Sequence, residues 1–551
     1  MGWSNMSEAK TGNPTEPIVG TNATTRSIPW SIGLALFLLV GIIAVMGLRQ
    51  HREFFHDDAY ITLRYADQWQ KGQGPVWNES ERVEGYTSFL HLATLYSLYS
   101  LQSLELTPET LARIVGVLSY LSIGIFIVGF SFRFHTTYLR IPLALVLMAS
   151  IMTSFPLIAW SWGGLETSLY TFLLMVCIYL FTIWCSRQSN SKHLTLGILF
   201  GLTVMTRPEA VLFVAVSILA LWAIHRSFKP SLVLVLGFCL IYLPYFVWRW
   251  NYYGEPLPNT YYAKLGTPLY KRLQDGFYYL HTFVRTAPWL PLVAIGCWLY
   301  TLFKQPDRRT AAWYSLSAHC LIGVIYIVWT GGDHMPAYRF WTPLLPVFTL
   351  LIAYTLFPID PEGNSDDSKS LSLTPAMVMV SLLLALSFLQ FLSADERMLN
   401  ARRADPAGAT GKKIGTYIST HFPDDSLIAT NSAGAVAFFA PQKQFIDMLG
   451  LNDRQIAKRE NVPMLTYWQQ FPGHSKGDGR YVISREPDYI ILGPAQGTVG
   501  KIDNKNRQNL VWFLSDQEIV EQTDFLQRYE LKQVQIHDTL TFTYYQRKQS
   551  H

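Results

Sequence analysis

The sequence predicts a polytopic α-helical membrane protein of about eleven transmembrane helices with a C-terminal α/β domain. Half of the 551 residues are hydrophobic and only 15% are charged, whereas soluble domains carry about 25% charged residues. Uncharged apolar runs recur through residues 28–393, and each can cross the roughly 30 Å of hydrocarbon in a bilayer. Residues 394–551 are more polar and contain apolar stretches of strand length only.

The distribution of basic residues and cysteines excludes two broad classes of protein. Lys and Arg are spread over short loops and form no basic face of the kind that binds nucleic acid. All five cysteines lie inside apolar runs or at their ends, so the sequence predicts neither a disulfide framework nor a cysteine-based metal site. They are Cys177, Cys185, Cys239, Cys297 and Cys320.

The first 110 residues contain a tail, an anchor and a loop. Residues 1–27 are rich in Thr, Asn, Ser and Gly, which predicts a disordered cytoplasmic tail. Residues 29–48 are apolar and lack a small-residue cleavage site, which predicts a retained signal anchor. The polar segment 49–110 then forms the first extracytoplasmic loop of a transmembrane domain that covers residues 28–393.

The remaining apolar runs predict further spans. Residues 194–224 form one apolar stretch that Arg207-Pro208-Glu209 interrupts, and proline disfavours a helical conformation in the residue before it. We therefore expect two short helices, 194–205 and 209–225, that meet at this turn. The other spans are expected at residues 114–132, 141–160, 167–185, 230–248, 286–303, 311–330, 340–357 and 374–393.

Lys and Arg in alternate connections predict the orientation. The basic connectors are Arg133 with Arg140, Arg187 with Lys192, Arg226 with Lys229, and Lys304 with Arg308 and Arg309. Placing them in the cytoplasm puts Asp57-Asp58, the loop 249–287 and the C-terminal domain on the opposite face, although the acidic 358–373 loop fits this topology poorly. The expected location is the bacterial inner membrane, with the active site and residues 394–551 in the periplasm.

The C-terminal domain has the pattern of an α/β fold. Residues 426–430 and 489–492 are apolar runs typical of buried strands, and residues 539–545 predict a terminal strand. The segment Asn431-Ser432-Ala433-Gly434-Ala435 has the pattern of a strand–turn–helix junction. One glycine is too few for a dinucleotide-binding fingerprint, so we interpret the junction as a structural turn.

The acidic pair Asp57-Asp58 begins a short polar helix directly after the anchor. Acids at a helix start pair with free N–H groups, so the pair can be purely a cap. Partial desolvation near a membrane can also raise a carboxylate's basicity, which would suit a base that deprotonates an acceptor hydroxyl. Arg64 falls on the same helical face as Asp57, where it is either a substrate ligand or a surface cation.

Charged residues at span ends are further candidates. Arg207 is either a phosphate ligand or half of an ion pair with Glu209 at the turn. Lys264 lies in an aromatic loop whose rings are either an interfacial belt or a stacking surface for sugars. Asp333, His334 and Arg339 follow another span; with one histidine and no ligand spacing they make a divalent cation conceivable but predict no metal site.

Two loops of the C-terminal domain, around Asp447 and around His474, are polar enough to bind sugar hydroxyls, although turn chemistry explains them equally well. Together with segments earlier in the chain, these loops form an ordered set of motifs. The set comprises Asp57-Asp58-Ala59-Tyr60-Ile61, Arg64-Tyr65-Ala66, Gly72-x-Gly74, Val83-Glu84-Gly85-Tyr86-Thr87, Leu165-Glu166-Thr167, Arg207-Pro208-Glu209, residues 256–264, Gly332-Asp333, Asp447-x-Leu449-Gly450-Leu451, Gly473-His474 and Lys476-Gly477-Asp478-Gly479.

Over roughly residues 30–500 this order resembles the GT-C superfamily of membrane glycosyltransferases, specifically the terminal β-(1→2)-arabinofuranosyltransferase family. The resemblance implies an inverting enzyme that takes a sugar from a polyprenyl-phosphate donor and passes it to an extracytoplasmic glycan or glycolipid. It implies Asp57 as the general base, with Asp58 as the second choice, and a C-terminal domain that helps to bind the acceptor. Relatives of this family also occur outside arabinan-making bacteria, so the resemblance does not fix the sugar.

The candidate residues then divide by expected role. Candidates for the donor phosphate or for substrate binding are Arg64, Arg207, Glu209, Lys264, His334 and Arg339. Candidates on the acceptor side are Tyr86, Glu166, Asp333, Asp447 and His474. Two alternatives stay open: a transporter or flippase of a lipid-linked sugar, which should show mid-membrane charges and repeated halves, and a non-catalytic glycan-binding membrane protein.

Overall fold

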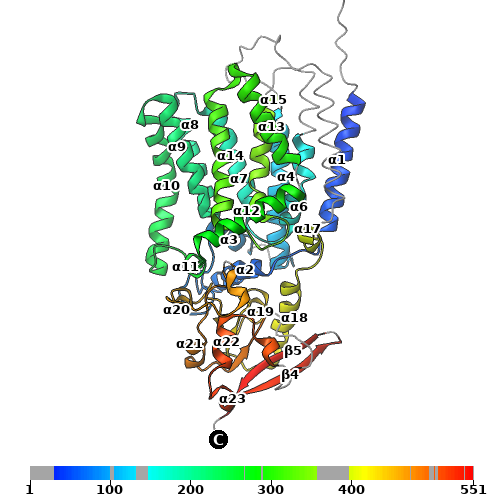
Figure 1. The fold of residues 1–551 in the computed structure, drawn as a ribbon, viewed down its shortest axis with the longest axis vertical. Coiled ribbons are helices and arrows are strands. Elements are labelled where there is room, and N and C mark those ends of the chain that lie inside the picture. Colours follow the sequence, from blue (N-terminus) through cyan, green and yellow to red (C-terminus); the bar gives the residue numbers. More distant parts are fainter. Residues whose placement is uncertain are drawn as a thin grey trace, which may run out of the picture.

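The computed structural model of the chain consists of a helical bundle with the C-terminal domain against one end (Figure 1). It describes residues 30–99, 105–131, 147–265, 267–286, 289–356, 396–471, 473–494, 502, 507–538 and 540–549. The expected tail at 1–27, the loop at 358–373 and the span at 374–393 lie outside these residues. The structure is a polytopic helical membrane protein with a C-terminal α/β domain.

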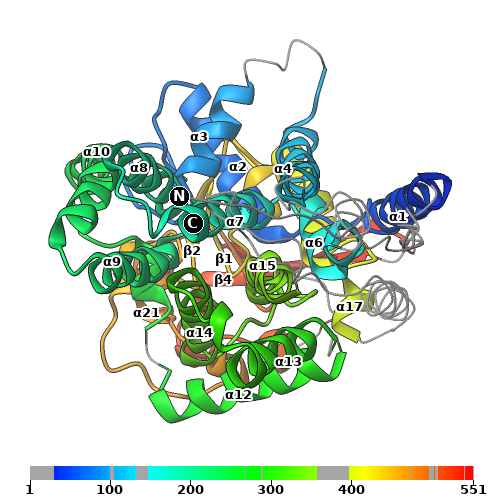
Figure 2. The ribbon, with the colours of Figure 1, turned by 90° about the horizontal axis from the view of Figure 1, so that it is seen from above.

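The bundle is built from long apolar helices, most of which are seen end-on in Figure 2. They are α1 (Trp30–Gln50), α4 (Pro108–Ser131), α6 (Phe155–Trp162), α7 (Thr167–Trp184), α8 (Asn190–Thr206), α9 (Val211–His225), α10 (Phe228–Tyr253), α13 (Trp289–Lys304), α14 (Ala311–Thr330) and α15 (Leu344–Leu356). Within the described ranges, five helices are long and apolar enough to cross a membrane, or six if one bent pair counts as a span. The predicted count of about eleven is therefore not confirmed.

The predicted break at Arg207-Pro208 is confirmed. Helix α8 ends at Thr206, Arg207 has an extended backbone with φ −149° and ψ 121°, and a short 3₁₀ turn, η2 (Pro208–Ala210), leads into α9. Because proline disfavours the helical region for the residue before it, Arg207 takes an extended conformation and α8 ends there. The break places the Arg207 side chain at the end of the bundle that faces the C-terminal domain.

The prediction that residues 249–287 form a loop is wrong. The segment contains the end of α10, the short helix α11 (Asn259–Ala263) and an eighteen-residue helix, α12 (Leu269–Thr286). Leu273, Gly276, Leu280 and Phe283 recur at helical spacing, which predicts an amphipathic helix. Charged residues and tyrosines lie between these positions, so the segment contains no long uncharged run and its helical period is less evident.

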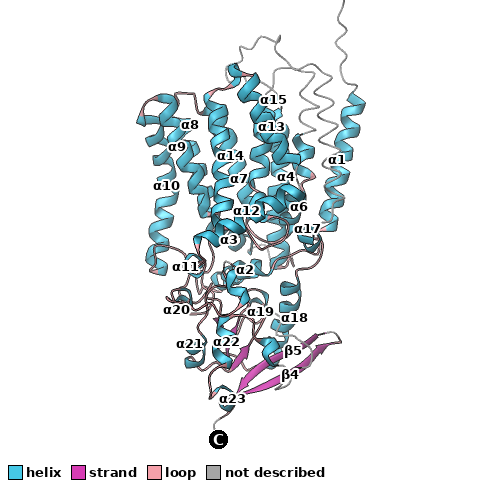
Figure 3. Cartoon of the chain, viewed as in Figure 1, coloured by secondary structure: helices cyan, strands magenta, loops and turns pink. Residues whose placement is uncertain are grey.

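The C-terminal domain contains a five-stranded mixed sheet in the order β2-β1-β3-β5-β4 (Figure 3). The strands are β1 (Leu427–Thr430), β2 (Gln444–Asp447), β3 (Tyr489–Ile491), β4 (Tyr529–His537) and β5 (Leu540–Arg547). Strand β1 pairs in parallel with β2 and β3, whereas β5 is antiparallel to β3 and β4. The three strands predicted from apolar runs are confirmed; β2 and β4 were not predicted.

Short helices surround this sheet. They are α18 (Pro406–His421), α19 (Ala435–Phe438), α20 (Arg454–Ala457), α21 (Gly479–Ser484), α22 (Leu514–Val520) and α23 (Phe525–Arg528), with 3₁₀ turns at Tyr467–Gln470 and Arg507–Leu510. Helix α17 (Glu396–Asn400) precedes them and packs against the bundle, where Arg397 donates to the backbone oxygen of Asp333. In the bundle, further 3₁₀ turns lie at Pro306–Arg308 and Arg339–Trp341. The expected strand–turn–helix junction is confirmed, because α19 begins at Ala435 directly after the turn that follows β1.

Helix α2 (Asp57–Gln70), followed by α3 (Phe89–Leu98), lies at the junction of the bundle and the C-terminal domain (Figure 1). Arg64 of α2 is 2% exposed. Its guanidinium donates to the backbone oxygens of Trp77 (2.7 Å) and Lys443 (3.0 Å) and to that of Ala437. The group also stacks on the rings of Trp77 and Phe445. Arg64 is therefore a cross-link between α2 and the C-terminal domain, and the expectation that it binds substrate is wrong.

We predict that Arg64→Met destabilises the protein without removing any group of the site. The substitution removes the Arg64 hydrogen bonds to three backbone oxygens, of which that of Ala437 keeps the Ala440 N–H as a donor; each buried acceptor left without a donor costs about 1–3 kcal/mol. Thermal unfolding of the purified protein should show a clearly lower Tm. Arg52→Met is the control, since Arg52 is exposed and, among the described residues, pairs only with its neighbour Glu53; equal Tm values for the two variants would contradict the structural role.

Candidate functional site

The two adjacent acids at the start of α2 point in different directions. Asp57 is 8% exposed, and its carboxylate accepts hydrogen bonds from the Ala435 N–H at 2.8 Å and from the Ser432 hydroxyl at 3.3 Å. A Cβ at Gly434 would lie 2.4 Å from Oδ2 of Asp57, so only glycine leaves room for the carboxylate. Asp57 is thus packed into the turn before α19.

Burial, assisted by the neighbouring charges of Asp58 and Asp405 and opposed by the hydrogen bond from Ala435, raises the pKa of Asp57 to about 7. The backbone N–H of Asp57 donates to Asp405 Oδ2 at 3.0 Å. Neither acid is the N-cap of α2: that position belongs to His56, whose Nδ1 accepts from the Asp58 N–H at 3.2 Å. The expectation that the acidic pair caps α2 is therefore wrong, and Asp57 instead contacts the C-terminal domain.

Asp58 keeps 41% of its side-chain surface accessible and belongs to what we term the outer polar cluster, namely Asp58, Lys264, His334 and His474. The negative charge of Asp58 acts to raise the pKa of all three partners. The rings of His334 and His474 lie 5.4 Å apart, so the bundle and the C-terminal domain each supply one imidazole. Many protein atoms surround Lys264 and His334, but both side chains still reach solvent. This combination is typical of side chains on the wall of a recess.

Burial is the largest influence on the pKa values of Lys264, His334 and His474, the three partners of Asp58. It lowers the pKa of His474 to about 4 and also lowers the pKa values of His334 and Lys264. The His474 imidazole is therefore neutral at neutral pH and is suited to hydrogen bonding rather than to charge pairing. Within the described ranges, Lys264 forms no side-chain hydrogen bond or ion pair, so its ammonium group is available to a ligand.

Arg207 is held between two carboxylates in the same region. Its guanidinium lies 2.8 Å from Glu166 Oε1 and 2.7 Å from Glu209 Oε1, and it stacks on the Phe340 ring. Burial acts to raise the pKa of Glu166, but the charges of Arg207, Arg339 and His91, with the hydrogen bond from Arg207, together outweigh it and the pKa is lowered. The interpretation of Arg207 and Glu209 as an ion pair within the turn is confirmed, with Glu166 as an additional partner.

Arg339 forms a second pair with Asp333, at 2.7 Å. Burial acts to raise the pKa of Asp333, yet Arg339 and His334 hold it at about 2. Both Arg339 and Arg207 also act to lower the pKa of Lys264, so these positive charges lie near the outer polar cluster. The structure thus brings together residues that are distant in the sequence and that follow the ends of different helices.

Two predicted acceptor-side residues lie elsewhere. Tyr86 is buried, and its hydroxyl is 2.9 Å from that of Tyr253. Asp447 is fully buried at the end of β2 and accepts hydrogen bonds from Leu449 and Asn452; burial raises its pKa to about 6. Both side chains hold loops in place, so the expectation that they face an acceptor is wrong.

The described residues contain no group of three or more His, Cys, Asp or Glu side chains that could hold a metal ion.

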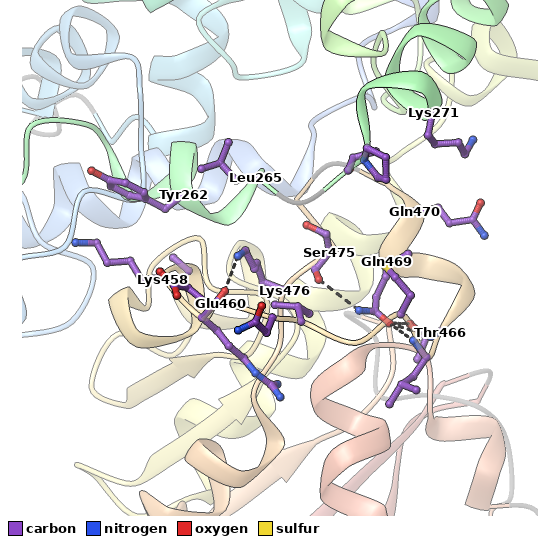
Figure 4. A pocket seen from close by; sticks show the side chains of 18 of the residues that line it. Tyr262, Leu265, Lys271, Lys458, Glu460, Thr466, Gln469, Gln470, Ser475 and Lys476 are labelled. Atoms are coloured by element: carbon purple, nitrogen blue, oxygen red, sulfur yellow. Dashed lines mark hydrogen bonds between the residues drawn. The ribbon is translucent and has the colours of Figure 1, made fainter.

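A large cavity lies beside the outer polar cluster. This slot of about 1180 Å³ separates the α11–α12 segment from the C-terminal domain (Figure 4) and was not predicted, because it forms only when the two domains meet. Its lining includes Tyr262, Lys271, Lys458 and Lys476.

The chain is similar to two proteins named terminal β-(1→2)-arabinofuranosyltransferase. It is 29% identical over 371 residues to the one from Mycobacterium tuberculosis, an alignment that covers 61% of this chain and 58% of that protein. It is 26% identical over 352 residues to the one from Corynebacterium glutamicum, covering 56% of this chain and 48% of that protein. The chain thus spans about half of the length of these relatives.

Residues 400–545 match a family model described as a domain of unknown function, DUF8728. Among solved structures, ArnT from Cupriavidus metallidurans bound to undecaprenyl phosphate gives a TM-score of 0.49 at 11% identity, covering 76% of this chain and 86% of that one. The Archaeoglobus fulgidus oligosaccharyltransferase gives 0.47 at 11% identity, covering 75% and 63%. The two named relatives confirm the resemblance inferred from the motifs: the chain is similar to the terminal β-(1→2)-arabinofuranosyltransferases.

Proposed function

We propose that the protein is an inverting GT-C glycosyltransferase that moves a sugar from a polyprenyl-phosphate donor to an extracytoplasmic glycan or glycolipid. The observation that carries the proposal is the outer polar cluster, where Asp58 and the unpaired Lys264 lie together at the ends of the spans. The names of the two relatives support the reaction class. Three of the basic connectors lie at the other end of the described helices and support an outward-facing site in the inner membrane; they are Arg187 with Lys192, Arg226 with Lys229, and Lys304 with Arg308 and Arg309.

Lys264 is the proposed ligand of the donor phosphate. A phosphate attracts ammonium and guanidinium groups strongly, and such contacts are stronger where protein excludes water. Arg207 and Arg339 already carry carboxylate partners, at 2.7–2.8 Å, so they contribute long-range positive potential. Lys264 has no partner among the described residues, and it can therefore stabilise the phosphate as negative charge develops on it.

Asp58, rather than Asp57, is the proposed general base. In the reaction, the acceptor hydroxyl oxygen attacks the anomeric carbon on the face opposite the phosphate, the carbon–oxygen bond to the phosphate breaks, and the hydroxyl proton passes to Asp58. Inversion follows from this single displacement. Asp57 cannot take that proton without leaving its contacts with Ala435 and Ser432, whereas the Asp58 carboxylate is accessible.

The slot is the proposed path of the acceptor. Leu265 and Ser475 line it, and they directly follow Lys264 and His474, so its inner end borders the outer polar cluster. Tyrosines, amides and lysines on its walls suit the apolar faces and hydroxyls of sugars (Figure 4). A neutral His474 can position an acceptor hydroxyl toward Asp58 through a hydrogen bond.

We predict opposite outcomes for the two acids. Asp58→Asn should lower the rate of transfer from a labelled polyprenyl-phosphate arabinofuranose by about 10²–10⁴-fold, because an amide cannot act as a base. Asp57→Asn should retain most of the activity of whatever fraction remains folded. Initial rates, normalised to folded protein by size-exclusion chromatography, test the assignment; full activity in Asp58→Asn would exclude Asp58 as the base.

The raised pKa of Asp57 predicts the pH dependence of stability. The folded state holds the proton up to about pH 7, whereas an unfolded aspartate releases it near pH 4. Between these values the folded state binds more protons, so its stability falls as the pH rises. Asp57→Asn should flatten the plot of Tm against pH from 4 to 7. An unchanged slope would show that Asp57 does not titrate in the interface.

Lys264→Gln should weaken donor binding. The loss of one charge-assisted contact, about 1.5–3 kcal/mol, corresponds to a KM for the donor that is about 10–100-fold higher. Lys413→Gln is the matched control, because Lys413 is an exposed lysine of α18. An unchanged donor KM in Lys264→Gln would remove Lys264 from the phosphate site.

A further inference from the structure

Helix α12 lies across the bundle instead of along it. It bends by 94° from α13, and Figure 2 shows it lengthwise at the edge of the bundle, beside helices that are seen end-on. Because α13 packs along α15 within the bundle, a helix perpendicular to it runs parallel to the membrane plane. Its charged and polar residues also make α12 too polar to cross the hydrocarbon by itself.

The contacts of α12 place it at the end of a span. A Cβ at Gly276 would lie 2.1 Å from the backbone oxygen of Val328, so α12 presses directly on the last turn of α14. Arg272 also stacks on Trp329, with 5.8 Å between the guanidinium carbon and the ring. Tryptophan at the end of a span is typical of the membrane–water interface. Helix α12 is therefore at headgroup level on the side of the C-terminal domain.

The face of α12 that points away from the protein is aromatic and basic. Tyr270, Phe277 and Tyr278 are 73%, 60% and 63% exposed, which is unusual for three large rings on one helix that faces only water. Arg285 is exposed on the same helix. Exposed aromatic rings combined with cations in a helix parallel to the membrane are the pattern of interfacial helices.

The charge of α12 indicates which lipids it meets. The helix carries three cations, Lys271, Arg272 and Arg285, and one acid, Asp275, which pairs with Lys271. Arg272 packs on Trp329 of α14, so Arg285 supplies the exposed positive charge of the outward face. Each cation near an anionic surface contributes about 1 kcal/mol of attraction. A headgroup layer with anionic phospholipids therefore complements this face better than a zwitterionic layer does.

We propose that α12 is a membrane-docking helix whose aromatic face lies in the outer headgroup layer and binds anionic phospholipid headgroups. Tyr270 and Lys271 also line the slot, so docking of α12 sets one rim of the slot at the membrane surface. An amphiphilic molecule can then enter the slot without leaving the bilayer. The docking itself is independent of the proposed reaction.

Depth-dependent fluorescence quenching tests the position of α12. An environment-sensitive dye is attached to the new cysteine of the full-length variant Tyr278→Cys. The labelled protein is placed in nanodiscs whose lipids are spin-labelled near the headgroup. The unsubstituted protein gives the background from the native cysteines. Lipid quenching should be strong at Tyr278→Cys and weak at Arg480→Cys, an exposed position of α21. Equal, weak lipid quenching at both positions would overturn the proposal.

Lipid composition tests the charge preference. The Tm of the protein should be about 2–4 °C higher in nanodiscs that contain phosphatidylglycerol than in phosphatidylcholine alone. The double variant Tyr278→Ser/Arg285→Gln should lose most of that difference while keeping its Tm in phosphatidylcholine. A full difference in the double variant, or none in the unsubstituted protein, would contradict binding of anionic headgroups by α12.

Discussion

The contact between Asp57 and the turn before α19 determines the geometry of the candidate site. Successive residues of a helix point about 100° apart, so anchoring one side chain at a helix start also fixes the direction of the next. With the Asp57 carboxylate bound by Ala435 and Ser432 against Gly434, Asp58 must point elsewhere. It points to the outer polar cluster, and the C-terminal domain thereby positions an acid that belongs to the bundle.

Arg64, two turns further along α2, reinforces this arrangement. It binds three backbone oxygens, of which two belong to the C-terminal domain, so the start and the middle of the helix are tied to that domain. Helix α2 therefore cannot rotate about its axis without breaking buried polar contacts, each of which is costly to lose. His474 reaches the site from the same domain. The site is complete only when the bundle and the domain are joined.

The sequence predicted features that depend on local pattern. Apolar runs predicted several helices of the bundle and three strands, and Pro208 predicted the break at Arg207, because these signals lie within a few residues. The roles of single residues depend on contacts between distant segments, which no local pattern contains. The Ala435 N–H that binds the Asp57 carboxylate, for example, lies 378 positions further along the chain. The helical period of α12 was present in the sequence, but it was hidden by charges that suit a helix lying on a membrane rather than within it.

The charges at the site restrict how a phosphate can be bound. Arg207 and Arg339 resemble phosphate ligands in the sequence, but each forms an ion pair at 2.7–2.8 Å with at least one buried carboxylate, and separating such a pair leaves a buried charge uncompensated. The neutral imidazole of His474 adds no charge. In the proposed reaction Lys264 therefore provides the positive charge that can move toward a phosphate, because both arginines are already paired. Asp58 and Lys264 would then serve the two halves of the proposed displacement, as acceptor of the hydroxyl proton and as ligand of the leaving phosphate.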